Sequence, residues 1–194
     1  MIIGLHGEPG SGKDTVGEFL YTKHDFCVYR MADPLKFGLS RMFNIPLEDI
    51  ENQDIKNLPS YKFGKSIRYL MQTLGTEWGR NMVEDDVWIK MAIENIENIE
   101  NRESTPPFMQ SNIVITDIRF DNEAKMVQDM GGHVIEITRP HNESNGLTAG
   151  VQNHTSNAGI IPSLIDRLII NDGTVTQLYK KVDDFMFNIS RCHG

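Results

Sequence analysis

Short apolar runs alternate with segments of helical periodicity along all 194 residues. Runs rich in Ile, Val and Leu predict buried strands at 1–6, 26–32, 111–117, 133–138 and 167–171. Apolar positions three or four residues apart predict helices at 13–23, 34–43, 64–81, 85–102, 121–130 and 174–189. Because strands that alternate with helices form parallel sheets, we expect an α/β fold of three layers around a five-stranded, mainly parallel sheet.

Two stretches interrupt this alternation. Residues 44–63 are polar, and we expect them to form a mobile excursion. Residues 139–163 have no hydrophobic period and are rich in Asn and Gly. A structureless loop of this length is uncommon in a compact domain unless it is a lid or is disordered. We favour a lid.

Composition and charge narrow the function classes. The length and the even composition predict a single domain, 1–194. A formal charge of −8 argues against a nucleic-acid polymer as partner, since Lys and Arg drive duplex binding. No stretch has the length of a membrane span and the N-terminal apolar run is too short for a signal peptide, so we expect a cytoplasmic protein. Cys27 and Cys192 are too few and too far apart for a disulfide framework or a zinc site, and we expect both to be reduced.

The first fifteen residues, MIIGLHGEPGSGKDT, join a strand, a glycine-rich turn and the start of a helix. Gly7, Gly12 and Lys13 have the Gly-x4-Gly-Lys spacing of a phosphate-binding P-loop. In such a loop the backbone N–H groups and the positive end of the helix face one anion site, and the lysine adds a charge for the outer phosphates. The alternative is a glycine-rich turn that binds nothing. We favour a site for nucleotide phosphates.

Asp14 stands where this motif normally has a Ser or Thr ligand of magnesium. A carboxylate is also a hard oxygen ligand, so Asp14 keeps a metal role open while it adds repulsion toward phosphate. The hydroxyl of Thr15 either binds an inner phosphate oxygen, which we favour, or helps to close the first helical turn.

The third expected strand ends in a carboxylate, Asp117. Open parallel sheets bind ligands at the carboxyl ends of their strands, so we expect Asp117 to orient Mg²⁺ or its waters. The alternative is a cap on the next helix. Arg119 follows at once, and we expect it to approach the transferring phosphate while Glu123, four residues on, holds it in place.

The third expected helix carries a polar stripe. Its members recur every four residues and are Arg68, Gln72, Thr76 and Arg80. Gly75 and Gly79 interrupt the helix at about 1 kcal/mol each, which is easiest to explain if a ligand or another backbone comes close. A phosphate for Arg68, a base edge for Gln72 and an aromatic wall from Trp88 would form a nucleotide acceptor site. The alternative is a solvated polar face beside a core tryptophan.

Taken together, these motifs resemble the bacteriophage deoxynucleoside monophosphate kinases. The matching segments are GEPGSGKDT, Ala32-Asp33-Pro34-Leu35-Lys36, Arg68 to Arg80 with its Leu-Gly-Thr-Glu, Trp88, Thr-Asp-Ile-Arg-Phe-Asp-Asn-Glu, His154-Thr-Ser156 and Asn171-Asp-Gly-Thr174. The resemblance implies a P-loop kinase fold and transfer of the γ-phosphoryl group of ATP to a deoxynucleoside monophosphate, with Mg²⁺.

The resemblance also implies roles for single residues. It suggests Ser11, Lys13, Asp14 and Thr15 at the ATP phosphates, and with them we expect Gly10, Gly12, Arg139, Asn171, Gly173 and Thr174. Around the acceptor it suggests Arg68, Gln72, Gly75, Thr76 and Trp88, and with them we expect Asp33, Lys36 and Arg80. Lys13, Asp117, Arg119 and Glu123 are the expected catalytic residues, and Asp14 and Asp117 the expected metal ligands. Two positions depart from the family pattern: Tyr69, where relatives often have a basic residue, and Asn157, where Glu commonly follows Ser.

A monophosphate acceptor is already anionic, so transfer to it needs positioning and charge neutralisation rather than a strong base. Two other functions remain open. A kinase of a small hydroxyl metabolite, similar to dephospho-coenzyme A kinases, would use Asp33 as base. A nucleotide-dependent switch would use its long loops to bind a protein. We expect small-molecule partners and neither a nucleic-acid polymer nor a membrane, leave a homodimer open, and expect the host cytoplasm as location if the chain is phage-encoded.

Overall fold

The computed structural model describes residues 1–59, 64–103, 112–140 and 159–192. The chain divides into two compact units: residues 1–30 with 96–194 form the first, and residues 31–95 form the second. The second unit is therefore inserted in the sequence of the first. That all 194 residues form one domain stays a prediction.

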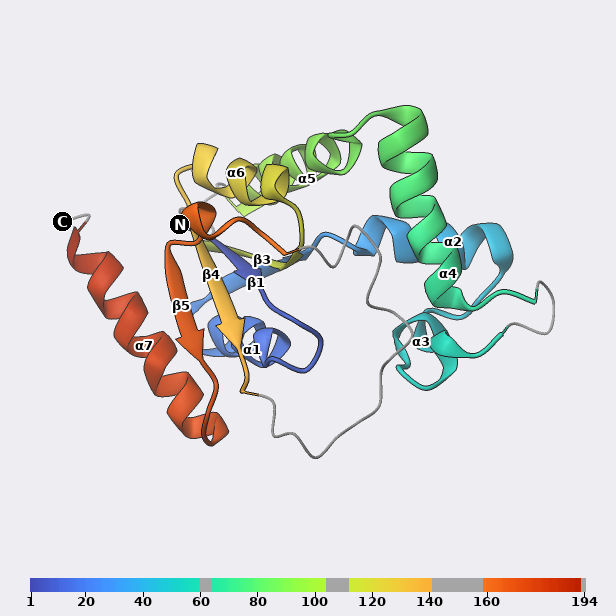
Figure 1. Cartoon of the computed structure of the whole chain (residues 1–194). Helices are drawn as coiled ribbons and strands as arrows, with labels where there is room; N and C mark the ends of the chain where they lie inside the picture. The colour runs from blue at the N-terminus through green and yellow to red at the C-terminus, as the bar shows by residue number, and fades with distance from the viewer. Residues whose placement is uncertain (60–63, 104–111, 141–158, 193–194) are drawn as a thin grey trace. The chain divides into compact units, whose positions relative to one another are not determined.

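The first unit contains the expected parallel sheet (Figure 1). Its strands are β1 (Ile2–His6), β2 (Phe26–Arg30), β3 (Asn112–Ile118), β4 (His133–Thr138) and β5 (Arg167–Ile170). They lie in the order β2-β3-β1-β4-β5, and all four neighbouring pairs are parallel. The predicted strands are confirmed, with ends that differ by at most two residues.

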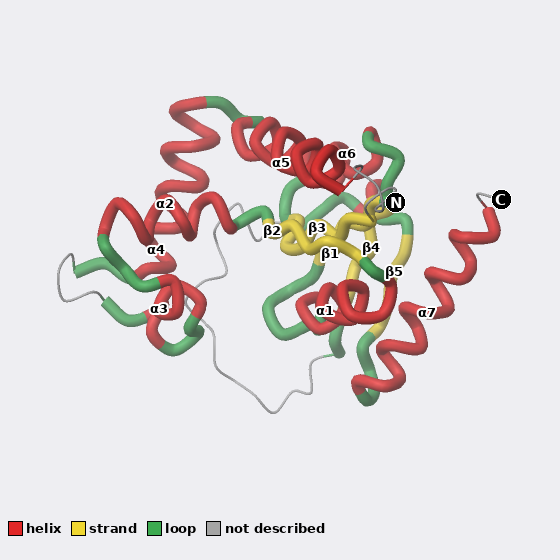
Figure 2. Tube along the Cα trace, turned by 180° about the vertical axis from the view of Figure 1, so that it is seen from behind, coloured by secondary structure: helices red, strands yellow, loops and turns green. Residues whose placement is uncertain are grey.

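Helices cover both faces of this sheet, which completes the three expected layers (Figure 2). On one face lie α1 (Lys13–His24) and α7 (Val175–Cys192), and on the other lies α6 (Asp121–Asp129). The core between the sheet, α1 and α7 includes Leu5, Leu20 and Val182, all fully buried. On the opposite face the side chain of Val127 in α6 packs against Gly4 of β1. Burial on both faces explains why β1 reads as a continuous apolar run.

The second unit is helical. It contains α2 (Asp33–Phe43), α3 (Leu47–Glu51), the 3₁₀ turn η1 (Ile55–Asn57), α4 (Ile67–Gln72), the π-helix η2 (Thr73–Val83) and the beginning of α5 (Val87–Glu103). Leu39, Ile50 and Ile67 form its core. The expected polar excursion at 44–63 thus holds two short helical segments, and Ile50, only 1% exposed, anchors α3 in that core. The sequence pattern missed them because each is shorter than two helical turns.

The predicted single helix at 64–81 is wrong in its geometry. The α-helical part begins after Ser66, whose Oγ accepts a hydrogen bond of 3.1 Å from the backbone N–H of Tyr69. From Thr73 to Val83 the helix widens, and a five-residue bond of 3.0 Å from Glu84 N–H to the Gly79 carbonyl follows. π-Helical turns are rare and concentrate at functional sites.

The two glycines in this segment face side chains of the same unit. A Cβ at Gly79 would lie 2.5 Å from Cζ2 of Trp88, and one at Gly75 would lie 3.2 Å from Cδ1 of Leu35. Both glycines do have close neighbours, but these are side chains, and not the ligand or backbone that the sequence suggested. Nε1–H of Trp88 also donates a 2.8 Å hydrogen bond to the Gly75 carbonyl, so this indole braces the widened helix.

The expected lid at 139–163 falls mainly on residues 141–158, which lie outside the described residues. Its C-terminal end is described and fixed. Ile160 is buried, the backbone N–H of Ile161 donates a 2.9 Å hydrogen bond to Oδ1 of Asp121, and the 3₁₀ turn η4 (Pro162–Leu164) follows. Within the described part of the chain, none of the helices combines the length and the apolar character needed to cross a membrane.

Candidate active site

The P-loop connects β1 to α1 in the first unit. Gly12 occupies the N-cap position of α1 with a φ of 105°, and among the described residues α1 receives no side-chain cap. Its first N–H groups are thus left for a ligand. Lys13, the first residue of the helix, is buried, and its Nζ lies 3.8 Å from Oδ2 of Asp14 and 3.6 Å from Oδ1 of Asp117.

Asp117 occupies a β-bulge in β3. Leu5 and His6 of β1 pair with Thr116 and Ile118, so Asp117 is the extra residue between them. Its φ of 69° lies in the left-handed region, which is unfavourable for residues with a Cβ. Bulges and such backbone strain concentrate at functional sites, where they redirect a side chain. Here the bulge brings the carboxylate of Asp117 to Lys13.

Asp117 is held between two cations. Besides Lys13, the Nη2 of Arg119 donates a 2.7 Å hydrogen bond to Oδ2 of Asp117. Burial alone would raise the pKa of Asp117, but the charges and hydrogen bonds of Arg119 and Lys13 outweigh it and hold the pKa below its ordinary value of 3.8. The carboxylate is therefore ionised at neutral pH, as a residue that pairs with cations must be.

Glu123 contacts the backbone at the start of α6. Its Oε2 accepts hydrogen bonds from the backbone N–H of Arg119, at 2.8 Å, and of Phe120, at 3.2 Å. Glu123 thus caps the start of α6 and holds the backbone at Arg119, while Asp117 holds the guanidinium. The prediction that Glu123 holds Arg119 in place is confirmed for the main chain of Arg119, and a catalytic role of Glu123 stays a prediction. The alternative that Asp117 caps α6 is wrong, since Glu123 supplies this cap.

The segment after β5 supports the P-loop. Asn171 is buried, and its Nδ2–H donates a 2.8 Å hydrogen bond to the carbonyl of Ser11. The Oγ of Ser11 is buried and has no hydrogen-bond partner among the described residues. Thr174 caps α7 together with Gln177: Thr174 N–H donates to Oε1 of Gln177 at 2.8 Å, and Gln177 N–H donates to Oγ1 of Thr174 at 3.3 Å. Contacts of Asn171 and Thr174 with ATP stay predictions.

The expected acceptor residues lie in the second unit. Nε of Arg68, on α4, donates a 2.7 Å hydrogen bond to Oδ1 of Asn57, which orients the guanidinium. Lys36 donates to Oδ1 of Asp33 and to Oε1 of Glu51, both at 3.2 Å. Asp33 itself is the first helical residue of α2, with Ala32 at the N-cap.

The rest of the polar stripe differs in exposure. Gln72 and Thr76 are partly exposed, whereas Arg80 is buried and donates a 3.1 Å hydrogen bond to the carbonyl of Asp85. Trp88 is 9% exposed, and its indole N–H donates a hydrogen bond to the Gly75 carbonyl. Trp88 is thus a core residue of the second unit, as one of the two alternatives expected, and its contact with the acceptor stays a prediction.

The structure gathers the predicted residues into two sets, one in each unit. The first unit holds Gly10, Ser11, Gly12, Lys13, Asp14, Thr15, Asp117, Arg119, Glu123, Arg139, Asn171, Gly173 and Thr174. The second unit holds Asp33, Lys36, Arg68, Gln72, Gly75, Thr76, Arg80 and Trp88.

Residues 50–182 match the family model "Deoxynucleotide monophosphate kinase". The chain belongs to this family. A protein of Acanthamoeba polyphaga mimivirus, named as a candidate deoxynucleotide monophosphate kinase, is 31% identical over 199 residues, and the match covers 98% of each chain. The deoxynucleotide monophosphate kinase of Escherichia phage RB69 is 30% identical over 121 residues, which cover 62% of this chain and 45% of that protein. Among solved structures, the dephospho-CoA kinase from Campylobacter jejuni superposes with a TM-score of 0.52 at 15% identity over 100% of this chain and 98% of its own. This likeness shows the P-loop kinase fold alone.

Two polar neighbours in this deoxynucleotide monophosphate kinase family member were missed by the sequence analysis. Asn57 contacts Arg68 from η1, and Lys65 lies with its Nζ 4.8 Å from the centre of the Tyr69 ring. A cation thus lies beside Tyr69, where relatives often have a basic side chain. The Asn57 contact has no sequence signal, because it depends on how η1 folds back onto α4, whereas Lys65 is only four residues from Tyr69.

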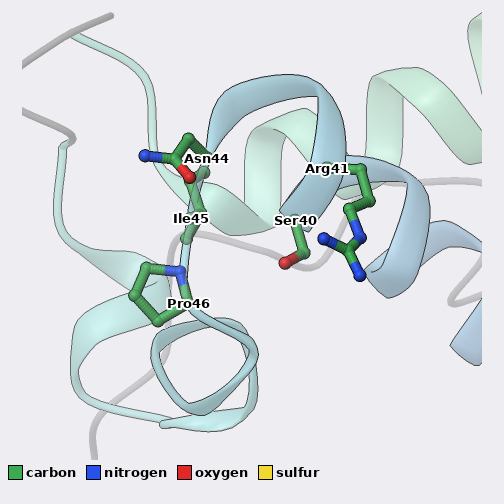
Figure 3. Close-up of a pocket in the computed structure, with 5 residues that line it drawn as sticks. All are labelled: Ser40, Arg41, Asn44, Ile45 and Pro46. Carbon is green, nitrogen blue, oxygen red and sulfur yellow. The ribbon is translucent and has the colours of Figure 1, made fainter.

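The second unit also has a shallow cavity of about 280 Å³ at the end of α2 (Figure 3). It is lined by Ser40, Arg41, Asn44, Ile45 and Pro46, five residues outside the predicted site. Arg41 is exposed and belongs to the same unit as Arg68, which makes it a useful control for experiments on this kinase.

Proposed function

We propose that this enzyme transfers the γ-phosphoryl group of ATP to the phosphate of a deoxynucleoside monophosphate. An oxygen of the acceptor phosphate attacks the γ-phosphorus, the bond to the β–γ bridging oxygen breaks, and ADP leaves with that oxygen. The products are a deoxynucleoside diphosphate and ADP. The observation that carries the proposal is Asp117, whose backbone is strained and whose carboxylate pairs with Lys13 and Arg119 beside the P-loop.

The ATP side is a cluster of positive charge at the beginning of α1. The uncapped N–H groups of the first turn bind phosphate oxygens, and Lys13 neutralises the outer phosphates. Arg119, whose side chain is 45% exposed, extends to the transferring group. Acceptor and donor are both anionic, so their phosphates repel each other when they come together. Fixed cations reduce this electrostatic repulsion.

The family also implies a divalent metal, and we propose Mg²⁺. The described residues contain no cluster of three or more His, Cys, Asp or Glu side chains that could hold a metal by themselves. Mg²⁺ does not need one, because it keeps several waters and binds one or two carboxylates together with substrate phosphates. Asp14, with a side chain 84% exposed, fits as a direct ligand. Asp117 already faces two cations and fits as a residue that orients bound water. Bound there, the ion neutralises phosphate charge.

The acceptor side is proposed at the polar stripe of the second unit. The Nε of Arg68 donates to Asn57, and within the described residues its two Nη groups have no hydrogen-bond partner, which fits a phosphate bound in a fixed orientation. Gln72 and Thr76 follow on the same helical run. A hydroxyl-acceptor kinase is less well supported, because Asp33, its base, is paired with Lys36. The proposal covers small molecules only; the oligomeric state stays a prediction, and a phage-encoded chain would act in the host cytoplasm.

The test is release of ADP, measured in a coupled assay across the deoxynucleoside and ribonucleoside monophosphates, with a reaction that lacks acceptor. We expect acceptor-dependent release, highest with a deoxynucleotide, and loss of at least about 100-fold in kcat for Lys13→Ala. Lys13→Ala should keep the far-UV circular dichroism of the wild type. Release without any acceptor would favour the switch instead, and release only with a hydroxyl metabolite would favour the other kinase.

A further inference from the structure

Asn171 connects the end of the sheet to the P-loop across 160 residues of sequence. It follows β5 directly, and its backbone N–H donates a 2.7 Å hydrogen bond to the Thr138 carbonyl at the end of β4. Its side chain is buried and lies 2.8 Å from the Ser11 carbonyl. Because a carbonyl oxygen can only accept, the Asn171 side chain donates this hydrogen bond through Nδ2–H. The backbone of Asn171 is therefore fixed to the sheet while its side chain holds the loop.

The hydrogen bond acts on one peptide plane of the loop. The Ser11 carbonyl and the Gly12 N–H belong to the same planar, trans peptide unit, in which the two groups point in opposite directions. A donor that holds the carbonyl of Ser11 toward Asn171 consequently turns the N–H of Gly12 to the other side. The direction of an N–H group in the phosphate loop is thus set by a residue outside that loop.

Gly12 makes this contact both accessible and necessary. A Cβ at Gly12 would lie 2.6 Å from Nδ2 of Asn171, so a larger residue would push the amide away. Without a Cβ and with a φ of 105°, however, Gly12 can reach both signs of φ, and the Ser11–Gly12 peptide can rotate at low cost. The hydrogen bond from Asn171 to the Ser11 carbonyl restricts this rotation.

We propose that Asn171 is a positioning residue of the P-loop, which fixes the Ser11–Gly12 peptide with its N–H toward the ATP phosphates. This differs from direct contact with ATP, since the side-chain amide of Asn171 donates a hydrogen bond to the loop. The proposal rests on the proposed function only in taking the P-loop as the ATP site. Asn171 therefore acts on ATP affinity through the loop and leaves acceptor affinity unchanged.

The variants separate the hydrogen bond from charge and from local damage. Asn171→Ala removes the side-chain amide, and Asn171→Asp keeps its shape but replaces the donor by a carboxylate. Because a new negative charge could itself repel ATP, Asn171→Asp is also combined with Asp172→Asn, which restores the net charge. Asp172→Asn alone is the matched control, because Asp172 is exposed and pairs with Lys181 on α7 at 2.7 Å.

Steady-state kinetics give the first readout. We expect KM for ATP to rise by at least about tenfold in Asn171→Ala, Asn171→Asp and the charge-restored double variant, which corresponds to about 1.4 kcal/mol. We expect the acceptor KM to stay at the wild-type value in all of them, and both constants to stay there in Asp172→Asn. An unchanged KM for ATP in Asn171→Asp would overturn the proposal, and so would an equal rise of both KM values.

Equilibrium binding makes the test independent of the acceptor. Titration of ATP and of inorganic pyrophosphate is followed by the backbone amide resonance of Gly12. We expect a large downfield shift in the wild type and a smaller shift at weaker affinity in Asn171→Ala. If the wild type binds ATP in this way but phosphorylates no deoxynucleotide, the proposed function fails and the role of Asn171 stands. If the Gly12 resonance responds equally in both proteins, the role of Asn171 fails.

The wild-type protein alone provides a last measurement, which holds even if none of the variants folds. The side-chain amide protons of Asn171 should exchange slowly with solvent in the absence of nucleotide, because the hydrogen bond to Ser11 exists before ATP binds. Fast exchange without ATP would overturn the proposal.

Discussion

The guanidinium of Arg119 and the carboxylate of Asp117 form a 2.7 Å charged hydrogen bond although only one residue separates them in the sequence. In a regular strand, residues at positions i and i+2 lie on one face about 7 Å apart, and the bulge at Asp117 changes this geometry. The same carboxylate lies 3.6 Å from Nζ of Lys13. One strained residue thus orients both cations that we assign to the transferring phosphate.

The ionisation of Asp117 predicts a pH dependence of stability. Since the folded-state pKa of Asp117 lies below its ordinary value of 3.8, its contribution is present above that value and is lost as pH falls through the lowered pKa. The free energy of unfolding should be measured for the wild type and Asp117→Asn from pH 7 downward. We expect a constant difference above about pH 5 and a shrinking difference below pH 3.8. A difference that grows toward acid would contradict the pairing.

The left-handed backbone at Asp117 predicts an inversion of the usual order of substitutions. Asp117→Gly should be more stable than Asp117→Ala by about 1 kcal/mol, because only glycine adopts a φ of 69° without strain. Both variants should lose transfer, since both lack the carboxylate. Chemical denaturation gives the stabilities and the ADP-release assay gives the rates. If alanine proved the more stable, the strain assigned to the bulge would be absent.

Asp14 should affect the metal requirement. If its exposed carboxylate is a ligand of Mg²⁺, Asp14→Ala raises the Mg²⁺ concentration for half-maximal rate by about tenfold and leaves stability unchanged. Glu18→Gln is the control, because Glu18 is an exposed acid on the same helix, one turn further on. Equal metal dependence in the two variants would remove Asp14 from the metal site.

Arg68 should act on the acceptor. Loss of a charge-assisted contact to the acceptor phosphate is worth about 1.5–3 kcal/mol, so Arg68→Ala raises the acceptor KM far more than the ATP KM. Asn57→Ala should cause a smaller rise of the same kind, because it frees the guanidinium without removing it. Arg41→Ala is the control, because it also removes an arginine from the second unit, at the cavity of Figure 3 and outside the predicted acceptor site. Equal changes in both KM values for Arg68→Ala would exclude it from the acceptor site.

Trp88 distinguishes core packing from sugar selection. Trp88→Phe keeps a ring but removes the donor to the Gly75 carbonyl, which should lower stability by about 1–3 kcal/mol. If Trp88 also forms the wall against a 2′-hydroxyl, replacement by a smaller apolar residue lowers the preference for deoxy acceptors, measured as the ratio of kcat/KM for deoxy over ribo acceptors. A fixed ratio with reduced stability would leave Trp88 as the brace of η2 and assign sugar selection to other residues.

Local patterns were enough to predict much of this protein. The run His-Val-Ile-Glu-Ile-Thr predicted β4 at its observed bounds, and the spacing of Gly7, Gly12 and Lys13 predicted the turn between β1 and α1. Both signals lie within a few residues, where backbone sterics and hydrophobic period determine the conformation. The alternation of strands and helices predicted a mainly parallel sheet, and the combined motifs predicted the family, whereas the strand order became known only from the structure.

Tertiary structure decided what depends on residues far apart in the sequence. Asn171 reaches Ser11 across 160 positions, the Trp88 ring packs against Gly79, and the bulge gives Asp117 a positive φ that its sequence neighbours do not predict. Glu123 binds the backbone N–H groups of Arg119 and Phe120, because the start of α6 leaves N–H groups that need an acceptor. The physical reason is the same in each case. A periodic pattern indicates which residues are buried. The direction of a polar side chain, in contrast, depends on which hydrogen-bond partner lies near it once the sheet and helices are packed.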